Sequence, residues 1–574
     1  MKNGFVSYLN TMHNASGSNE HAIAENNIND KDNFSGEILF ERNITEKIIE
    51  KLCEGLGKIV ILTGHAGDGK TSILQEIVRR CTGKEMDARK LQDDFIYRNN
   101  RHIHYVKDMS EHEKEEQIQI FREAIQAVKR EESVILISNT GPLFHALQEL
   151  GMEEERIIEL LDTTRLKENQ ENFREYGPVP IVVVNLALFD NSDIIGKFLE
   201  KTLQEKLWSD CQNCEKREYC PICFNQENMR ENKKQIMDFC EWYYRWNFEH
   251  GERFTVRQIL AHLSYAITGN LNCKNIAKLL GRRNQKRILY NTFSNLFFGF
   301  HYEKELSLRD VDALQIKPIA LIQKQKLDTR KIPAEYALFV QNNLHIFRPK
   351  MEELLEACQT GKTGMLEEKK EYFRVMKRAY FMYHQKGEQE NIDIQKAVFS
   401  EMFSDYMQLQ NSERIRKDII MNIKRITFQG LHVLFMGTPP DEDDKIYLTA
   451  RRRGRMMQNV QISQGVIYKD SLDICIEEKE NMTNGKKEKI IQLFYNNVYM
   501  ELKLPVLEYF KELESGLIQN KIDPRLSQGV ENIKAKLYQA RRKSREDLTI
   551  VYSNGTKFQK TEVTIDENGI WVQN

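Results

Sequence analysis

The segment KIVILTGHAGDGKTSILQEIVRR (58–80) decides the fold of this chain. Its first part, 58–62, is apolar and β-rich, and its last part has apolar residues on one face of a helix. Between them GHAGDGKT (64–71) fits the pattern G-x-x-x-x-G-K-[ST], which is typical of a loop that cradles the phosphates of a nucleotide. Because this motif requires a strand before it and a helix after it, the segment predicts a P-loop nucleotide-binding fold.

Each position of this phosphate loop has a physical role. Gly64 and Gly69 let the backbone turn so that its N–H groups face the phosphates. Lys70 reaches the β- and γ-phosphates, Thr71 offers its hydroxyl to Mg²⁺, and the helix that begins here directs its positive dipole end at the anion. The predicted nucleotide-binding residues are Gly64, His65, Ala66, Gly67, Asp68, Gly69, Lys70, Thr71 and Ser72.

Three further strand candidates, 102–108, 133–139 and 180–186, alternate with helical patterns. Continuous apolar strands separated by helices predict an α/β fold with a parallel sheet covered on both faces. The following sequence is mostly helical to about 423. From about 424 the segment ITFQGLHVLFMGTPPDEDDKIYLTA predicts short strands with a Pro-Pro turn. At the end of the chain two Asn-Gly turns between alternating runs predict a β-meander. The expected parts are a flexible leader 1–36, a P-loop ATPase core 37–205, a helical lid 206–300, a helical domain 301–423 and a small α+β domain 424–574.

A magnesium-binding aspartate is expected at the end of a second strand. Asp108, which ends HIHYVKD (102–108), is the best candidate, and Asp190 after PIVVVNLALF is its rival. A strand-end aspartate can also be a plain turn residue.

The arrangement of loop, strands and strand-end acid resembles the AAA+ ATPases, and the resemblance implies further site residues. It implies an acid that polarises the attacking water, which here is Glu111, displaced by two positions, or is absent. It implies a polar γ-phosphate sensor at the end of the next strand, where Asn139 stands, unless Asn139 only forms a turn. It also implies a sensor arginine in RFTVRQILAHLSYAITG (253–269), for which Arg257 is favoured over Arg253. A finger arginine acting on a neighbouring subunit of a homo-oligomer would be Arg165 or Arg174, which could equally be surface residues.

Four of the ten cysteines lie within thirteen residues, and they are Cys211, Cys214, Cys220 and Cys223. Two Cys-x-x-Cys pairs can supply four thiolates to one tetrahedral ion, and a structural Zn²⁺ can fold so short and polar a loop. We therefore predict a zinc-binding insertion in the helical lid. An iron–sulfur cluster is the alternative, and a catalytic zinc is disfavoured because four cysteines close the coordination shell.

The composition limits the partners. The 84 lysines and arginines balance 85 aspartates and glutamates, so the chain does not coat nucleic acid by bulk positive charge, and DNA binding needs a local patch. Two basic segments, 450–457 and 538–545, are candidates for such a patch, although a charge run is more often a solvated surface. The sequence shows no membrane-length apolar run and no signal peptide, which predicts a cytoplasmic location.

The order of these features resembles the DptF/DndF-type proteins of bacterial phosphorothioation-dependent DNA restriction. The similarity is carried by LFERNITEKIIEKL, GHAGDGKTSIL, the strand-ending NTG, VVNLALFDN, the four cysteines ending in CPICFN, and RFTVRQILAHLSYAITG. It covers about 37–275, and the C-terminal half is similar only in length and texture. The resemblance implies an ATPase that works with partner proteins in anti-phage defence, restricting DNA that lacks the phosphorothioate modification, without nuclease chemistry of its own.

Other functions remain open at this stage. The chain could be a nucleotide-gated switch or scaffold with little intrinsic turnover, which the sequence Asp-Met-Ser-Glu (108–111) favours. A replication-initiator-like loader predicts a C-terminal helix-turn-helix, which this tail does not resemble. The last alternative is a zinc-stabilised signalling ATPase that binds no DNA.

Overall fold

The computed structural model divides the chain into two compact units, which are described separately. Unit 1 comprises Met1–Phe248, Arg253–Glu390 and Asn481–Lys486, and unit 2 comprises Glu249–Glu252, Asn391–Glu480 and Lys487–Asn574. The residues that the structure describes are 3–14, 34–38, 41–84, 91–163, 166–278, 285–359, 366–385, 387–437, 444–449, 460–481, 485–517, 523–541, 547–553, 558–565 and 571–573.

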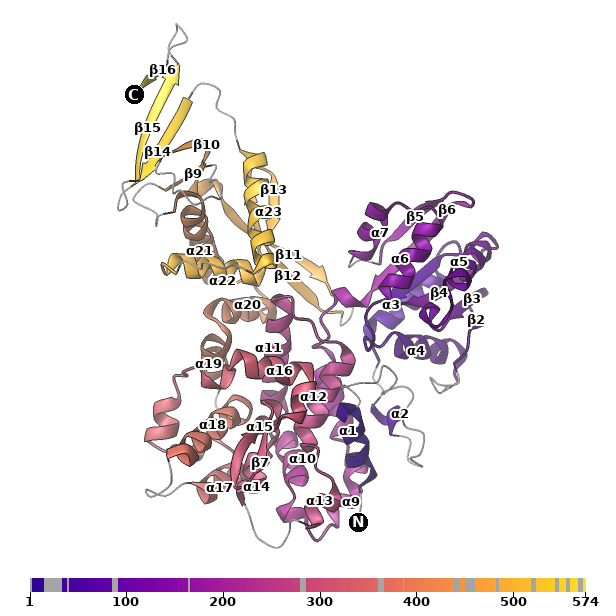
Figure 1. Ribbon diagram of the computed structural model, residues 1–574, viewed down its shortest axis with the longest axis vertical. Helices are drawn as coiled ribbons and strands as arrows, with labels where there is room; N and C mark the ends of the chain where they lie inside the picture. Colours follow the sequence, from indigo (N-terminus) through magenta and orange to yellow (C-terminus); the bar gives the residue numbers. More distant parts are fainter. Residues whose placement is uncertain are drawn as a thin grey trace. The chain divides into compact units, whose positions relative to one another are not determined.

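Unit 1 begins with an α/β region built on a six-stranded sheet of order β2-β3-β4-β1-β6-β5 (Figure 1). The four inner strands are mutually parallel, which confirms the predicted parallel α/β sheet at this coarse level. The strands are β1 (Ile59–Thr63), β2 (Asp94–Arg98), β3 (Arg101–Val106), β4 (Ser133–Ser138), β5 (Glu168–Phe173) and β6 (Gly177–Asn185). The helices of this region are α3 (Asn43–Cys53), α4 (Lys70–Thr82), α5 (Lys114–Lys129), α6 (Thr140–Glu149) and α7 (Glu154–Leu161).

Alternation along the central strand gives the sheet two cores. Ile59 and Ile61 of β1 belong to a core that also contains buried residues of α5, α6 and α7. Val60 and Leu62 belong to the opposite core, which contains buried residues of α3 and α4. Successive side chains of a strand point to opposite faces, so a wholly apolar strand is stable only where helices cover both faces.

The two edge strands differ from the predicted all-parallel sheet, because β2 and β5 run antiparallel to their neighbours. β2 joins β3 through Asn99 and Asn100, whose φ angles of 50° and 60° suit a tight two-residue hairpin turn. β5 is largely polar and pairs with β6 through another short turn. Neither strand has the continuous apolar run that identified the inner strands, so the apolar pattern did not reveal them.

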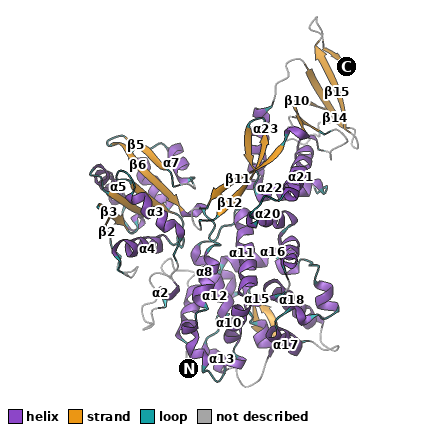
Figure 2. Cartoon of the chain, turned by 180° about the vertical axis from the view of Figure 1, so that it is seen from behind, coloured by secondary structure: helices purple, strands orange, loops and turns teal. Residues whose placement is uncertain are grey.

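The rest of unit 1 is mostly helical (Figure 2). Its longer helices are α8 (Ile194–Thr202), α10 (Pro221–Glu231), α11 (Lys233–Glu249), α12 (Val256–Thr268), α16 (Lys317–Gln325), α17 (Pro349–Cys358) and α18 (Leu366–Tyr383). Its short elements include α2 (Ser35–Ile38), α9 (Ser209–Gln212), α13 (Cys273–Lys278), α14 (Gln285–Tyr290), α15 (Phe293–Phe297) and the hairpin β7 (Phe300–Glu303) and β8 (Leu306–Arg309). Aromatic rings fill its core, where Phe239 of α11 stacks on Phe381 of α18 with ring centroids 5.4 Å apart.

The first helix, α1 (Gly4–Asn14), packs into this helical region. Phe5 and Leu9 are fully buried, and the ring of Phe5 meets the ring of Trp208 edge-on at 5.5 Å. The Asn10 amide donates to the backbone oxygen of Leu271 at 2.9 Å. The structure therefore differs from the flexible leader expected over 1–36 in this part, because the weak sequence periodicity concealed a helix with one apolar face.

Unit 2 combines helices with two antiparallel sheets, of orders β16-β15-β14-β10-β9 and β11-β12-β13. Its strands are β9 (Lys445–Thr449), β10 (Val460–Tyr468), β11 (Asp473–Glu480), β12 (Lys487–Tyr495), β13 (Val498–Glu501), β14 (Asp547–Ser553), β15 (Phe558–Ile565) and β16 (Trp571–Gln573). Its main helices are α20 (Glu401–Asn411), α21 (Lys417–Met436), α22 (Leu504–Glu514) and α23 (Pro524–Ala540), and α19 (Glu388–Ile394) spans the division between the units. The meander β14–β15–β16 confirms the predicted β-rich end.

The prediction of short strands from residue 424 onward is wrong for its first part, which is helix α21. Buried Ile419, Ile423 and Ile426 recur at helical spacing on this segment. The β-branched residues of ITFQGLHVLFM suggested strands, whereas burial of one helical face decided the outcome. The expected domain boundary at 424 consequently lies inside a helix.

Candidate nucleotide-binding site and cysteine cluster

The phosphate loop (64–71) joins the end of β1 to the start of α4, as its sequence predicts. Gly69 precedes the helix in the left-handed conformation, with φ 82° and no side chain capping the helix. Gly67 has φ 86°, and a Cβ at this position would lie 2.9 Å from the Cβ of Arg257. Both positions therefore require glycine. Because no side chain caps α4, its first backbone N–H groups remain able to donate to a ligand in the loop.

Lys70 is buried, and its ammonium group binds the loop and the neighbouring strand. Nζ donates to the backbone oxygens of Gly64 and His65, each at 3.1 Å, and to Oδ1 of Asn139 at 2.8 Å. Burial lowers the pKa of Lys70, against the opposing influence of Asp108 and Asp68. Because β1 and β4 are adjacent and parallel, their carboxyl ends bring Lys70 and Asn139 together.

The end of β3 contributes the third part of the site. Asp108 follows β3 and accepts a hydrogen bond at 2.9 Å from the backbone N–H of Ser110, in the 3-10 turn Met109–Glu111. The hydroxyl of Ser110 accepts a hydrogen bond at 3.0 Å from the backbone N–H of Asn139. Ser110 thus ties the ends of β3 and β4 together, a role that no sequence motif marked. Glu111 is exposed at the end of the same turn.

The remaining loop residues divide between two environments. Thr71 is half-buried and Ser72 is exposed on the first turn of α4, whereas Asp68 is fully buried. Asp68 Oδ2 accepts a hydrogen bond at 2.8 Å from the backbone N–H of His65, and its Oδ1 forms an ion pair with Arg253 at 2.9 Å. The buried carboxylate of Asp68 therefore fixes the backbone of the loop through His65 and connects the loop to Arg253.

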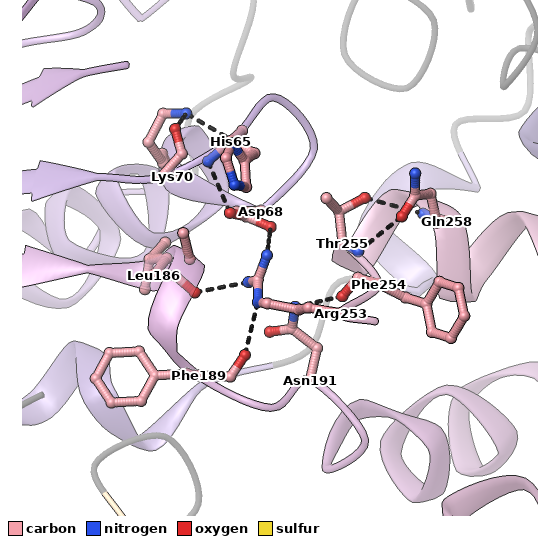
Figure 3. Close-up of polar contacts among 12 residues, drawn as sticks. His65, Asp68, Lys70, Leu186, Phe189, Asn191, Arg253, Phe254, Thr255 and Gln258 are labelled. Carbon is pink, nitrogen blue, oxygen red and sulfur yellow. Dashed lines mark hydrogen bonds and ion pairs between the residues drawn. The ribbon is translucent and has the colours of Figure 1, made fainter. Parts of the chain in front are cut away.

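Arg253 and Arg257, the two sensor candidates, both lie against the phosphate loop. Arg253 also donates to the backbone oxygens of Leu186, at 2.6 Å, and Phe189, at 2.8 Å (Figure 3). Arg257 donates its backbone N–H to the oxygen of Gly67 at 3.0 Å, and its charge lowers the pKa of Lys70.

Arg42, which precedes α3, completes the group behind the loop. It is buried, and it donates to the backbone oxygen of Asp68 at 3.3 Å and to the side chain of Asn191 at 3.0 Å. We refer to Arg42, Asp68, Asn191 and Arg253 as the rear cluster. Its members come from four separate stretches of sequence, which is why no local motif predicted it.

The other predicted acids and arginines lie elsewhere or outside the description. Asp190 bonds the backbone and hydroxyl of Ser192 in its own loop and forms an ion pair with Arg245 at 3.4 Å. Arg174 is exposed in the turn between β5 and β6. Arg165 and the basic segment 450–457 lie outside the described residues, as does the second half of 538–545.

The cysteine cluster spans α9 to α10, and three of its thiols lie close together. Hydrogen bonding with Cys223 lowers the pKa of Cys211 to about 7 and also lowers the pKa of Cys220. The Asn3 side chain donates to Cys211 Sγ at 3.3 Å. These soft donors fit Zn²⁺ by their chemistry. Over the described ranges, however, no group of three or more His, Cys, Asp or Glu side chains has an arrangement that could hold a metal ion. The zinc site therefore stays a prediction.

Comparison with known proteins gives no match: no family model, no curated protein and no solved structure is similar to this chain. Within the part of the chain that the structure describes, no helix is both long and apolar enough to cross a membrane.

Proposed function

We propose that this chain is a P-loop ATPase of the AAA+ type, which binds ATP with Mg²⁺ at the phosphate loop. The observation that carries the proposal is the position of Lys70. Its ammonium group lies in a glycine-rich loop at the carboxyl ends of the parallel inner strands, bonded to Asn139, which follows the adjacent strand. Ligands bind at this edge of open α/β sheets, and the start of α4 adds backbone N–H donors for an anion.

The bonds of Lys70 suggest how nucleotide enters. The ammonium group is held by two backbone oxygens and one amide oxygen, and a triphosphate offers it stronger, charged acceptors. Exchange of partners would direct Lys70 to the phosphates and leave Asn139 near the reacting end. Thr71 and Asp108 would hold Mg²⁺, which supplies neutralisation of phosphate charge.

We further propose that the ATPase serves a bacterial DNA restriction system that acts on DNA lacking phosphorothioate modification, together with partner proteins. Support comes from the order of sequence features, from the lead-in helix through the phosphate loop and the cysteines to RFTVRQILAHLSYAITG. Binding of DNA and of the partner proteins belongs to this proposal.

A nucleotide-gated switch with little turnover is the second candidate, and Glu111 favours it. A residue that polarises water must reach the attacking nucleophile, yet Glu111 is exposed at the end of a 3-10 turn. ATP binding would then order the protein, and hydrolysis would be slow.

ATP turnover with and without DNA separates these two candidates. We expect DNA-stimulated turnover that disappears in Lys70→Ala, and Glu111→Gln then tests the acid. Saturable ATP binding without turnover, even with DNA, would contradict the stand-alone motor and support the switch. A protein that neither binds nor hydrolyses ATP would overturn both.

A further inference from the structure

A carboxylate inside a phosphate-binding loop needs an explanation, because its charge has the same sign as the ligand. Asp68 is the fourth residue of the loop after Gly64, and its side chain is fully buried. An isolated buried charge is strongly unfavourable, and a carboxylate this close to the phosphates would also repel them. A compensating cation is therefore required.

Arg253 supplies that cation from a distant part of the chain. Its guanidinium group pairs with Asp68 at 2.9 Å and is held in place by the backbone oxygens of Leu186 and Phe189 (Figure 3). These two oxygens follow β6, so the arginine also connects the loop to the sheet. Each of the three contacts uses a different N–H group, which a lysine could not reproduce.

The segment that carries Arg253 encloses the loop at a second point. Four residues later, the backbone N–H of Arg257 bonds the Gly67 oxygen, and no side chain would fit at Gly67. Thr255 between them caps α12 by accepting a bond from the Gln258 N–H at 3.3 Å. The loop is thus fastened to the start of α12 by one ion pair and one backbone bond.

We propose that Arg253 is a positioning residue that neutralises Asp68 and thereby makes nucleotide affinity depend on the contact between the phosphate loop and the start of α12. This inference rests on the proposed function. When Arg253 pairs with Asp68, the loop presents its N–H groups and Lys70 to an anion. When the pair is broken, Asp68 loses its ion-pair partner, and its carboxylate then opposes phosphate binding more strongly. Movement of α12 away from the loop would accordingly release nucleotide.

The test measures the dissociation constant of MgATP for the full-length chain, by titration with a fluorescent ATP analogue. Arg253→Met removes the ion-pair partner of Asp68 and should weaken binding by at least about tenfold. The double variant Asp68→Asn, Arg253→Met removes both charges and should restore affinity to within about threefold of wild type. Asp68→Asn alone should not weaken binding by more than about threefold, because it removes the carboxylate that repels phosphate and leaves the Arg253 cation.

A matched control is Arg156→Met, which also breaks an arginine pair with a buried carboxylate, Glu171, but at the contact of α7 with β5. It should lower the melting temperature without changing affinity. If Arg253 has only a structural role, Arg253→Met should also lower the melting temperature without changing the affinity for MgATP. Alternatively, the double variant should bind MgATP no more tightly than Arg253→Met. Either result would overturn the proposal.

The failure of this inference is distinguishable from the failure of the proposed function. If Lys70→Ala binds ATP as wild type does, the proposed function is wrong. If Lys70→Ala loses affinity but Arg253→Met keeps it, only the role of Arg253 is wrong. Should Arg253→Met fail to fold, Arg253→Lys keeps the cation, and its affinity is expected to exceed that of Arg253→Gln by at least about threefold. Equal affinities of those two variants would contradict the proposal.

Discussion

The phosphate loop and the cysteine cluster are both short sequence motifs, yet the chain completes only the first by itself. Every charged group described in the loop has a partner within the protein: Lys70 bonds two backbone oxygens and Asn139, and Asp68 pairs with Arg253. In the cysteine cluster three thiols approach one another through Cys223, without forming a metal-holding arrangement among the described residues.

The difference follows from what fixes each geometry. A glycine-rich turn is set by backbone conformation and by hydrogen bonds that the chain supplies. Four cysteines on a polar segment repel one another once ionised, so their final positions depend on an ion that joins them. A motif of the first kind forms through contacts within the chain, whereas a zinc-binding motif of the second kind would need its metal to be complete.

The largest expected effect tests the predicted zinc site of the cysteine cluster. Purified protein should contain about one zinc ion per chain, and Cys223→Ser should reduce this to near zero. Cys358→Ser is the control, because Cys358 is a buried cysteine of α17 that is not part of the motif, so the variant should keep the zinc. Metal content by mass spectrometry decides the matter. Iron together with sulfide would establish the alternative iron–sulfur cluster. Wild-type protein without metal would contradict the prediction that the cysteine cluster is a metal site.

The next effect concerns Asn139, which holds Lys70 in the loop. Asn139→Ala removes one competing acceptor from Lys70, so ATP affinity should stay within about threefold of wild type. If Asn139 also contacts the γ-phosphate, turnover should fall on the order of tenfold or more. Steady-state kinetics together with ATP binding separates these two roles of Asn139, because loss of a γ-phosphate contact in the transition state would lower kcat and leave the dissociation constant of ATP unchanged. A large loss of affinity with unchanged kcat would contradict this account of the loop.

A smaller effect is expected on α11, the helix between the cysteine cluster and Arg253. Burial raises the pKa of Glu241 from 4.5 to about 7. Between pH 4.5 and about pH 7, Glu241 therefore keeps its proton in the folded protein but loses it in the unfolded protein. Stability should therefore fall as pH rises through this window. The charges around Glu241 are Lys486, Asp238, Asp190 and Asp193.

Glu241→Gln removes this titration. The variant should gain about 2 kcal/mol relative to wild type on going from pH 5 to pH 8, measured by denaturant unfolding. Glu356→Gln is the control, because Glu356 is exposed on α17 and should show no such change. A constant difference between Glu241→Gln and wild type across this pH range would show that Glu241 is ionised in the folded protein throughout.

Sequence patterns predicted the parts of the fold that depend on local periodicity. The inner strands β1, β4 and β6 have continuous apolar runs because both of their faces are covered, whereas in β3 only alternate residues, Ile103 and Tyr105, are buried. The edge strands β2 and β5 lack this pattern, since one side of an edge strand faces solvent. Helix α21 was mistaken for strands because its Ile, Phe and Val residues favour strands individually, and tertiary burial overrode that preference.

The site divides in the same way. The loop from Gly64 to Thr71 was readable because its residues are contiguous, and Asn139 because it ends an apolar strand. The rear cluster was not, because Arg42 and Arg253 reach Asp68 only after the chain has folded. Ser110 likewise could not be predicted, because it contacts Asn139 only where β3 and β4 lie side by side in the folded sheet. Long-range polar contacts leave no periodic signal in a single sequence.

The most direct test of the central claim is equilibrium binding of MgATP to wild type, Lys70→Ala and Lys58→Ala. Lys58 is a matched control, since it is a buried lysine at the other end of β1 and pairs with Glu168. The account predicts saturable binding that Lys70→Ala weakens by about 10- to 100-fold and Lys58→Ala leaves unchanged. Equal affinities for all three proteins, or no binding by wild type, would contradict the assignment of the loop as a nucleotide site.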